Sequence, residues 1–398
     1  MPLTSPRPAK KIVLLLPANQ AFAHGVIRGV ARYSRPLRPW TFRLNRADDL
    51  SLKSLRAWKP DGLIVAEADP PLLNRLARQA TPFVSCGSSS AKKPIERIMV
   101  DNIAVGEMAA RYFLDRGFRH CAFVGERGRP FLLERGEAFG KAVQQAGATY
   151  DCFLPRRGTL SDHVLEAMWQ APDEDLHAWL KKLPRPTAIL TCHDLMALRI
   201  SDALRDLAIR VPDEAAVLGV DNDPMICELA NPPLSSVETP QEQIGFEAAR
   251  RLDRLMLGTA PRSAPAMLGP LRVVTRQSSD VMATDDRAIL AAMHFIEQHA
   301  DQPLRVDQVA DAADISRRSL ETRFAERLGR TILDEIQAAH VRRACTLLEQ
   351  PNWSLERVAL ASGFNSRERF SCVFRQVMGQ TPGTYRKQLN ATRKPGVF

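Results

Sequence analysis

Side chains that could recognise the edges of DNA bases lie between Ser354 and Arg386. Gly363 can provide a turn between two short predicted helices, and Ser366 can cap the second of them, Arg367–Met378. That helix has an apolar stripe with spacing i, i+3, i+4 and i+7, formed by Phe370, Val373, Phe374 and Val377. Its opposite face is polar and basic and carries Arg367, Glu368, Ser371, Cys372 and Arg375. Such a helix suits a DNA major groove, although an ordinary helical hairpin with a solvated charged face has the same pattern.

A second unit of the same kind precedes this one. Helices are predicted at Val306–Ala313 and Ser316–Leu328, and Asp314 lies in the turn, where aspartate tolerates the left-handed conformation. The outward side chains of its second helix are Arg317, Arg318, Glu321 and Thr322. A continuous helix predicted over Ile332–Gln350 joins the two units and would be about 28 Å long. Because helices in successive major grooves lie roughly 34 Å apart, a rod near that length can place both on one face of the duplex.

The distribution of charge favours an acidic partner for this segment. The net charge of the whole chain is +10. From Ile315 to the C-terminus there are 15 Lys or Arg residues against 7 Asp or Glu residues, an excess of +8. Arginine can pair bidentately with guanine, and glutamate can accept a hydrogen bond from cytosine. For each arginine the alternative is a phosphate contact, which positions a protein on DNA without reading its sequence.

Composition argues against several other classes of protein. The seven cysteines are scattered, with no C-x-x-C pair, which argues against a disulfide framework and a zinc site and fits the reducing cytoplasm. The N-terminal apolar run IVLLL is only as long as a strand, so we expect neither a signal peptide nor a membrane span. No P-loop or nucleophile-elbow motif is present, and the adjacent residues Cys192, His193 and Asp194 do not make a triad, which is a spatial arrangement. We therefore expect no enzyme activity, no cofactor and no metal.

Residues 10–275 alternate between patterns typical of buried strands and of amphipathic helices. Continuous apolar strands that alternate with helices predict parallel sheets covered by helices on both faces. The segment is long for one sheet, so two α/β lobes are predicted. From residue 285 onward every element is predicted to be helical. The predicted fold class is therefore a two-lobed α/β domain followed by an all-α domain with two helix-turn-helix units.

Four blocks of the first segment carry a family resemblance: VDNIAVGEMAARYFLDRGFRHCAFVG, LLERGEAFGKAVQQAG, PTAILTCHDLMALRISDALRDLAIRVPDEAAVLGVDNDP and PPLSSVETPQEQIGFEAARRL. In order and spacing they resemble the LacI/GalR regulators and the periplasmic sugar-binding fold. The resemblance implies a sensor domain over 1–276 whose lobes close on a small ligand. The implied lobes are about 10–116 plus 236–258, and 117–235 plus 259–276, with chain crossings near Arg116, Ser235 and Gly258. The predicted linker is 277–284.

A sugar site needs polar groups for the hydroxyls and an apolar face for the ring. The resemblance implies a ligand role for Arg135, for Asp221, and for His193 and Asp194, which stand where the family often has Asn-Asp. Three further candidates follow the first predicted strand, at the edge where open sheets bind ligands: Gln20, Phe22 and His24. Phe22 is the candidate for the ring face. Asp101 and Asn102 are predicted to cap a helix instead of binding a ligand.

The C-terminal run LLEQPNWSLERVALASGFNSRERFSCVFRQVMGQTPGTYRK resembles the second half of the AraC-type DNA-binding domain, here predicted over 285–390. In the first unit the resemblance implies base contacts at Arg318, Glu321 and Thr322, with Arg317 beside them. In the second unit it implies contacts at Arg367, Glu368, Arg369, Ser371 and Cys372.

The two resemblances together imply a sugar-responsive transcription regulator, an activator of pentose catabolism genes. The implied partners are an operator duplex, a small sugar such as a pentose, a second copy of the chain and RNA polymerase. The alternatives are a repressor relieved by a different small molecule and a sugar-binding enzyme.

Overall fold

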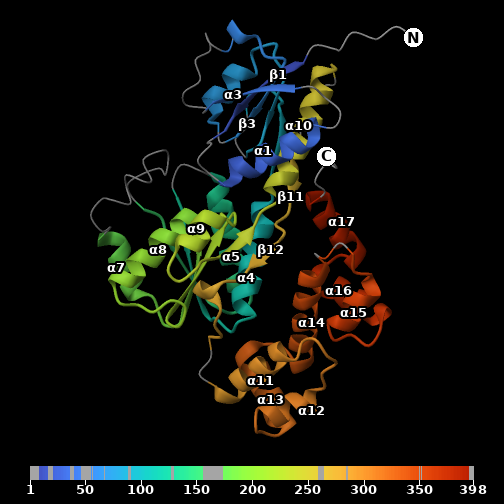
Figure 1. Cartoon of the computed structure of the whole chain (residues 1–398). Coiled ribbons are helices and arrows are strands. Elements are labelled where there is room, and N and C mark those ends of the chain that lie inside the picture. The colour runs from blue at the N-terminus through green and yellow to red at the C-terminus, as the bar shows by residue number, and fades with distance from the viewer. Residues whose placement is uncertain are drawn as a thin grey trace. The chain divides into compact units, whose positions relative to one another are not determined.

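The computed structural model describes residues 9–16, 21–35, 40–45, 55, 57–66, 68–87, 91–126, 130–155, 174–258, 264–283, 286–348, 350 and 352–393. The described residues form two compact units (Figure 1). The first, called the α/β unit, takes its residues from Met1–Phe113 and Arg119–Val281. The second, called the helical unit, takes its residues from Leu114–Phe118 and Met282–Pro395. The predicted fold class, an α/β domain followed by a helical domain, is confirmed.

The first lobe of the α/β unit is built on a six-stranded parallel sheet with the order β11-β5-β4-β3-β1-β2. Its strands are β1 (Lys10–Leu15), β2 (Trp40–Asn45), β3 (Gly62–Val65), β4 (Phe83–Ser85), β5 (Glu96–Val100) and β11 (Ala266–Leu268). The helices are α1 (Ala21–Ser34), α3 (Pro70–Leu76) and α10 (Gln241–Met256). α1 and α10 approach so closely that a Cβ at Gly29 would lie 2.0 Å from the carbonyl oxygen of Glu242. Four apolar residues of β1 are buried, because helices cover both faces of a parallel sheet.

The second lobe has a six-stranded sheet with the order β12-β10-β9-β8-β6-β7, in which only β12 runs antiparallel to its neighbour. Its strands are β6 (His120–Val124), β7 (Thr149–Phe153), β8 (Thr187–Thr191), β9 (Ala215–Val220), β10 (Ser235–Glu238) and β12 (Arg272–Val274). Its helices are α4 (Asn102–Leu114), α5 (Pro130–Gln145), α7 (Glu174–Lys182), α8 (Asp194–Asp206) and α9 (Pro224–Leu229).

The chain crosses between the sheets three times, at places that differ from the predicted ones. The first crossing is at Asp101, because β5 belongs to the first sheet and the following α4 packs on α5. The second is at Thr239–Pro240, between β10 of the second sheet and α10, which packs on α1. The third lies between the ends of β11 and β12, which pair with different sheets.

The predicted crossings near Arg116, Ser235 and Gly258 are therefore wrong, and so are the lobe limits built on them. Each error displaces a crossing by about one element. Only the pairing of the strands decides which sheet an element joins, and neither apolar runs nor helix periodicity carries that information.

The first residues of the predicted linker 277–284 are part of the second lobe. Gln277–Ser279 form a short 3-10 helix, η1, in which Ser278 and Ser279 are fully buried. The Ser278 hydroxyl donates to the carbonyl of Val217 at 2.7 Å and accepts from the backbone N–H of Ser235 at 2.8 Å. The polar composition that suggested a loop here satisfies backbone groups at the edge of β10 instead.

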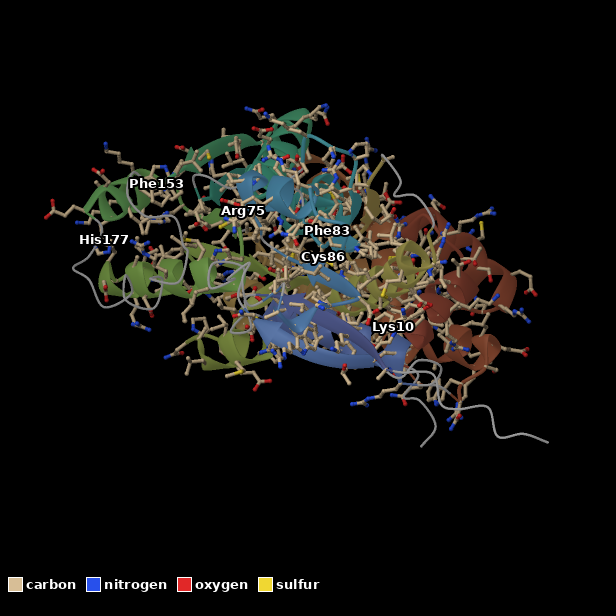
Figure 2. All side chains as sticks on the ribbon, turned by 90° about the horizontal axis from the view of Figure 1, so that it is seen from above. Lys10, Arg75, Phe83, Cys86, Phe153 and His177 are labelled. Carbon is tan, nitrogen blue, oxygen red and sulfur yellow. The ribbon has the colours of Figure 1, made fainter. Side chains whose placement is uncertain are left out.

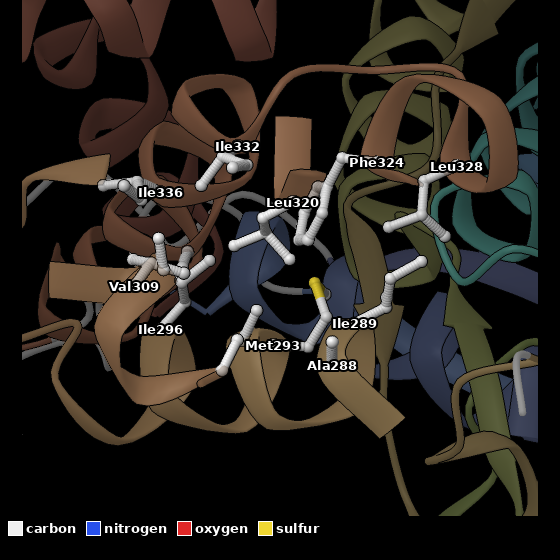
Figure 3. Close-up of a cluster of buried hydrophobic side chains, with 14 of the residues drawn as sticks. Ala288, Ile289, Met293, Ile296, Val309, Leu320, Phe324, Leu328, Ile332 and Ile336 are labelled. Carbon is white, nitrogen blue, oxygen red and sulfur yellow. The ribbon is translucent and has the colours of Figure 1, made fainter. Parts of the chain in front are cut away.

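The helical unit consists of α11 (Arg287–Gln298), α12 (Val306–Ala312), α13 (Arg317–Leu328), α14 (Ile332–Leu348), α15 (Leu355–Ala361), α16 (Arg367–Met378) and α17 (Pro382–Arg393). One apolar core joins α11, α12 and α13 to the first half of α14 (Figure 3). A second core joins α15, α16 and α17 to the last half of α14. α14 is two residues shorter than predicted, which makes it about 26 Å long. It is the common wall of both cores.

All seven cysteines are free thiols. Burial raises the pKa of Cys86, which follows β4 near Phe83 (Figure 2), to about 12. Among the residues that the structure describes, no group of three or more His, Cys, Asp or Glu side chains could hold a metal ion. None of the described helices has the length and apolar character needed to cross a membrane.

Candidate ligand site and nucleic-acid interface

Three polar side chains of the second lobe lie at one edge of its sheet. Strands β6, β8 and β9 are neighbours and parallel, and each is followed within one or two residues by a titratable side chain. These side chains are Glu126, His193 and Asp221. Because the carboxyl ends of parallel strands meet at one edge, where open sheets bind ligands, the three form a candidate polar site.

Asp221 has an unusual backbone conformation for a residue that is not glycine, with φ of 100°. Its Oδ1 accepts a hydrogen bond from the Thr239 hydroxyl at 2.9 Å, and its carbonyl accepts one from the Gln241 side chain at 2.9 Å. Both partners come from the second crossing between the lobes. Strained backbone that the surroundings hold in place is a common property of functional sites. Asp221 is therefore fixed at the hinge by Thr239 and Gln241.

His193 is the N-cap of α8. Its Nδ1 accepts the backbone N–H of Met196 at 3.1 Å, and its Nε2 lies 3.7 Å from the carboxylate of Glu126, which is buried. Burial by itself lowers the pKa of His193, but Cys192 and Glu126 outweigh it and raise that pKa. The neutral ring with its proton on Nε2 can keep Nδ1 as the acceptor for Met196 and face Glu126 with its N–H, whereas protonation of Nδ1 would remove the acceptor for Met196.

Asp194 is almost fully buried, and both of its carboxylate oxygens have protein partners. Oδ1 accepts from the Ser236 hydroxyl at 2.5 Å, and Oδ2 accepts from the backbone N–H of Asp223 at 2.6 Å. Burial raises the pKa of Asp194 to about 7, although both hydrogen bonds oppose the shift. A Cβ at Gly219 would lie 2.1 Å from Oδ1, so the close approach requires glycine there. Asp194 therefore connects the start of α8 to β10 and to the loop after β9.

Arg135 lies on α5 and is 4% exposed. Its Nε donates to the side-chain oxygen of Asn102 at 2.7 Å, and its Nη1 donates to the carbonyl of Cys192 at 2.5 Å. Asp101 does cap α4, since its carboxylate accepts the backbone N–H of Ala104 at 3.0 Å. Asn102 is not a cap: it is the first residue of the helix and orients Arg135. Its role was missed because a cap is the commonest use of Asn at a predicted helix start.

The candidates from the first lobe lie at the start of α1. Phe22 is half-buried and His24 is exposed. Gln20 lies outside the described residues. No ring contact between described residues connects Phe22 with Arg135, His193 or Asp221. The structure thus brings Arg135, His193 and Asp194 together in one lobe and puts Asp221 at the hinge. Glu126, which sequence reasoning missed, joins them, and its position two residues beyond β6 was the available signal.

Both helix-turn-helix units of the helical unit have the predicted turns and caps. Asp314 and Gly363 adopt positive φ values of 54° and 76° in the two turns. Ser316 caps α13 by accepting from the backbone N–H of Ser319, and Ser366 caps α16 in the same way with Arg369. The apolar stripes are buried in the two cores, so the polar faces of α13 and α16 point to solvent.

The polar face of α16 is open. Its exposed side chains are Arg367, Glu368, Arg369, Cys372 and Arg375, and Ser371 is half-buried. The pKa of Glu368 is held below its usual value by its own backbone N–H and by Ser366 and Arg367. In the part of the chain that the structure describes, the guanidinium groups of Arg367, Arg369 and Arg375 have no ion pair, so all three are available to a polyanion.

The polar face of α13 differs in this respect. The Arg317 Nε donates to Glu321 at 2.8 Å, and its Nη1 donates to Asp307 of α12 at 3.2 Å. Arg318 and Thr322 are exposed, and the Thr322 hydroxyl donates to the carbonyl of Arg318 at 3.0 Å. Arg317 and Glu321 therefore already have partners within the helical unit, whereas the guanidinium groups of Arg367, Arg369 and Arg375 have no ion pair in the described part of the chain.

A two-lobed α/β sensor fold joined to two helix-turn-helix units defines a class of protein, the ligand-responsive DNA-binding regulators. Three family models match the chain in the corresponding places. The XylR N-terminal domain matches residues 11–105, the periplasmic binding protein-like domain matches 110–279, and a helix-turn-helix domain matches 309–388.

The similarity to known proteins covers almost the whole chain. The xylose operon regulatory protein of Escherichia coli K12 is 31% identical over 386 residues, which cover 94% of this chain and 96% of that protein. The protein of the same name from Haemophilus influenzae is 29% identical over 94% of this chain and 98% of its own length. A solved structure of the xylose-binding transcription activator xylR has a TM-score of 0.60 and 30% identity, and the match covers 96% of this chain and 98% of that one. The chain belongs to the family of xylose operon regulatory proteins.

Proposed function

We propose that this chain is a cytoplasmic transcription activator that responds to xylose or a closely related pentose. The observation that carries the proposal is the similarity over nearly the full length, sensor and DNA-binding halves together, to a xylose-binding transcription activator. The polar edge of the second lobe supports a ligand with several hydroxyls, since it offers carboxylate, imidazole and guanidinium groups within one site. The proposal includes no enzyme activity.

In this proposal Arg135, His193 and Asp221 contact the sugar hydroxyls, and Phe22 and His24 of the first lobe are further ligand candidates. Gln20, the remaining candidate from the sequence, lies outside the described residues. Arg135 has two of its three guanidinium nitrogens bound to the protein, which leaves Nη2 for the ligand. Asp194 acts as a positioning residue, because its oxygens already hold Ser236 and Asp223.

The replacement Asp221→Ala tests the site. We expect xylose binding to be lost in calorimetry, because the carboxylate at the hinge is removed while Gln241 can still bond to the backbone carbonyl. Asp213→Ala removes a carboxylate from the exposed pair with Arg210 and serves as the matched control. A thermal-shift screen of pentoses and hexoses on the unaltered chain identifies the preferred sugar. Undiminished xylose affinity in Asp221→Ala would remove Asp221 from the site.

On the DNA side, α13 and α16 enter successive major grooves of one operator, and a homodimer brings two such pairs to DNA. RNA polymerase is the further partner that activation requires. The second candidate is a repressor that its ligand releases, which the exposed polar faces of α13 and α16 fit equally well. A reporter gene behind the footprinted operator distinguishes the two. Deletion of the regulator lowers sugar-induced expression if it activates, and raises expression without sugar if it represses.

A further inference from the structure

The turn that follows α4 belongs to the helical unit, although it lies in the middle of the sensor sequence. Leu114–Phe118 join Met282–Pro395 in one compact unit. The backbone N–H of Ala283 donates to the carbonyl of Arg116 at 2.8 Å. At Gly117, where φ is 83°, a Cβ would lie 3.0 Å from the side chain of Leu328, the last residue of α13. The turn after α4 therefore packs against the end of α13. We call α13 and α16, the second helices of the two helix-turn-helix units, the first and second readers.

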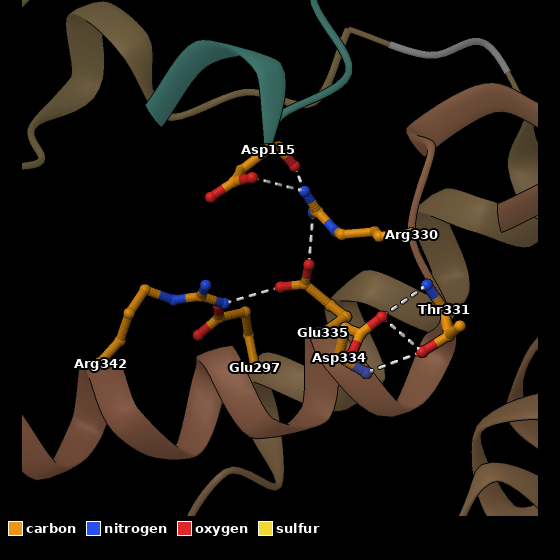
Figure 4. Close-up of polar contacts among 7 residues, drawn as sticks. All are labelled: Asp115, Glu297, Arg330, Thr331, Asp334, Glu335 and Arg342. Atoms are coloured by element: carbon orange, nitrogen blue, oxygen red, sulfur yellow. Dashed lines mark hydrogen bonds and ion pairs between the residues drawn. The ribbon is translucent and has the colours of Figure 1, made fainter. Parts of the chain in front are cut away.

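An ion-pair network fixes this turn to the junction between α13 and α14 (Figure 4). Arg330, only 15% exposed, pairs with the Asp115 carboxylate at 3.2 Å and also donates to the Asp115 carbonyl. The same guanidinium pairs with Glu335, which is buried on α14. Glu335 also pairs with Arg342 at 2.9 Å, and Arg342 pairs with Glu297 of α11. Asp115 is therefore the first member of a chain of charges that runs through Glu335 and Arg342 of α14 and ends at Glu297 of α11.

This network is partly shielded from solvent, which distinguishes it from ordinary surface pairs. Glu335 is 1% exposed, so its charge requires both arginines as partners. Loss of a charged group at one end of the network changes the strength of the remaining ion pairs, because members of one network are energetically coupled. Arg330 lies one residue after the left-handed cap Gly329 and two before α14, where the direction of α13 relative to α14 is set.

The other end of α4 holds a residue of the proposed ligand site. Asn102, the first residue of the helix, accepts the Nε–H of Arg135 at 2.7 Å. The helix between them has 13 residues and is about 20 Å long. Its last turn is bound within the α/β unit, where the Tyr112 hydroxyl bonds to Thr275 and Ser279. A change in the hydrogen bonding of Arg135 therefore acts on the first residue of α4, and Asp115 directly follows the last residue of that helix.

We propose that α4 transmits ligand occupancy to the DNA-reading helices, with Asn102 as its input contact to Arg135 and Asp115 as its output contact to Arg330. The inference rests on the proposed function, since it takes Arg135 to contact the sugar. Asn102 and Asp115 are positioning residues in this scheme: neither touches sugar or DNA. A hydrogen bond from Arg135 to the sugar alters the hydrogen bond between Arg135 and Asn102. Movement of α4 then alters the ion pair of Asp115 with Arg330 at the junction of α13 and α14.

The test uses the full-length chain with Asp115→Asn, xylose and the operator duplex that footprinting of the unaltered chain defines. We expect xylose affinity without DNA to stay unchanged. The ratio of operator affinities with and without xylose, typically about 5- to 150-fold for allosteric coupling, should fall toward 1. Because coupling is reciprocal, the operator should also stop changing the affinity for xylose. Asp115→Glu, which keeps the charge, should restore part of the ratio, and Asp213→Asn should leave it as it was.

A double-mutant cycle tests the relay without sugar. Asn102→Ala, which frees Arg135, should change operator affinity in the unaltered chain and have no such effect in Asp115→Asn. Equal effects of Asn102→Ala in both backgrounds would overturn the relay, as would an undiminished xylose response in Asp115→Asn. Failure of the unaltered chain to bind any pentose counts against the proposed function instead, and the cycle still decides the relay.

Discussion

At the scale of single residues, the helical unit holds a buried histidine whose protonation state matters. His340 on α14 is 5% exposed, its ring makes an edge-to-face contact with Phe364, and its Nε2 has no hydrogen-bond partner in the described part of the chain. Burial lowers the pKa of His340, and contact with the Gln302 backbone only partly opposes the shift. The neutral ring is thus the form that the folded state accepts.

The pH dependence of stability follows from this shift. A histidine pKa lowered by folding contributes stability above its unfolded value, about 6.5, and that contribution is lost as pH falls through the lower folded value. We expect the midpoint temperature for thermal unfolding of the helical unit to fall more between pH 7.5 and pH 5 in the unaltered chain than in His340→Phe. The replacement keeps an aromatic ring against Phe364 but cannot be protonated. Parallel curves for the two proteins would exclude His340 as the titrating group.

At the scale of elements, the turn of the second helix-turn-helix unit depends on Gly363 for two separate reasons. Its φ of 76° lies in the left-handed region, and a Cβ would lie 2.5 Å from the ring nitrogen of His340 and 2.7 Å from the carbonyl of Gln302. The first turn, with Asp314, needs only the conformation, which aspartate tolerates. The two turns look alike in shape but differ in how tightly the rod α14 approaches them.

Gly379 provides a matched control for this close approach. It caps α16 with φ of 70°, and nothing would lie within 4 Å of an added Cβ. Gly379→Ala should therefore cost only the conformational penalty, roughly 1–2 kcal/mol of unfolding free energy. Gly363→Ala should cost more, because the rod must also move away. Denaturant unfolding measures both, and equal losses would show that the second core absorbs the extra methyl group without strain.

At the scale of the whole molecule, the two helix-turn-helix units connected by α14 differ in how the charged side chains of α13 and α16 are paired. α13 has its Arg317 and Glu321 engaged with each other and with Asp307, whereas the arginines of α16 carry unpaired charge in the described structure. If both helices bind one duplex, as proposed, binding is bivalent, and loss of one contact weakens the complex without abolishing it. The second reader should therefore contribute the larger share of electrostatic attraction to DNA.

Arg367→Ala tests this division. If Arg367 reads a base, operator affinity should weaken by ~1–3 kcal/mol, and the footprint should fade on the half-site that α16 occupies while the other half-site remains protected. Arg357→Ala removes the same charge from α15, where the side chain stacks on Trp353 at 4.1 Å, and is the matched control. Equal weakening by the two replacements would assign Arg367 a general electrostatic role.

Much of this protein could be predicted from its sequence, because local patterns report local structure. Strand and helix alternation, the two apolar stripes and the serine caps predicted the α/β domain and the two helix-turn-helix units. The class of function came from the resemblance of the quoted blocks to two known families. Short elements with weak patterns escaped prediction, namely β7, α7, α9, β10 and β11. Their residues alternate too briefly for periodicity to separate them from loops.

What the tertiary structure alone decided is the partnership of distant residues. Strand pairing moved all three crossings and put η1 into the second lobe. Burial and hydrogen bonding separated Asp194, with both oxygens engaged, from Asp221, and added Glu126 and Asn102 to the site. Only the tertiary structure shows that Leu114–Phe118 pack within the helical unit. Charge pairs and close contacts depend on positions in space, and residues such as Asp115 and Arg330 become neighbours only when the chain has folded.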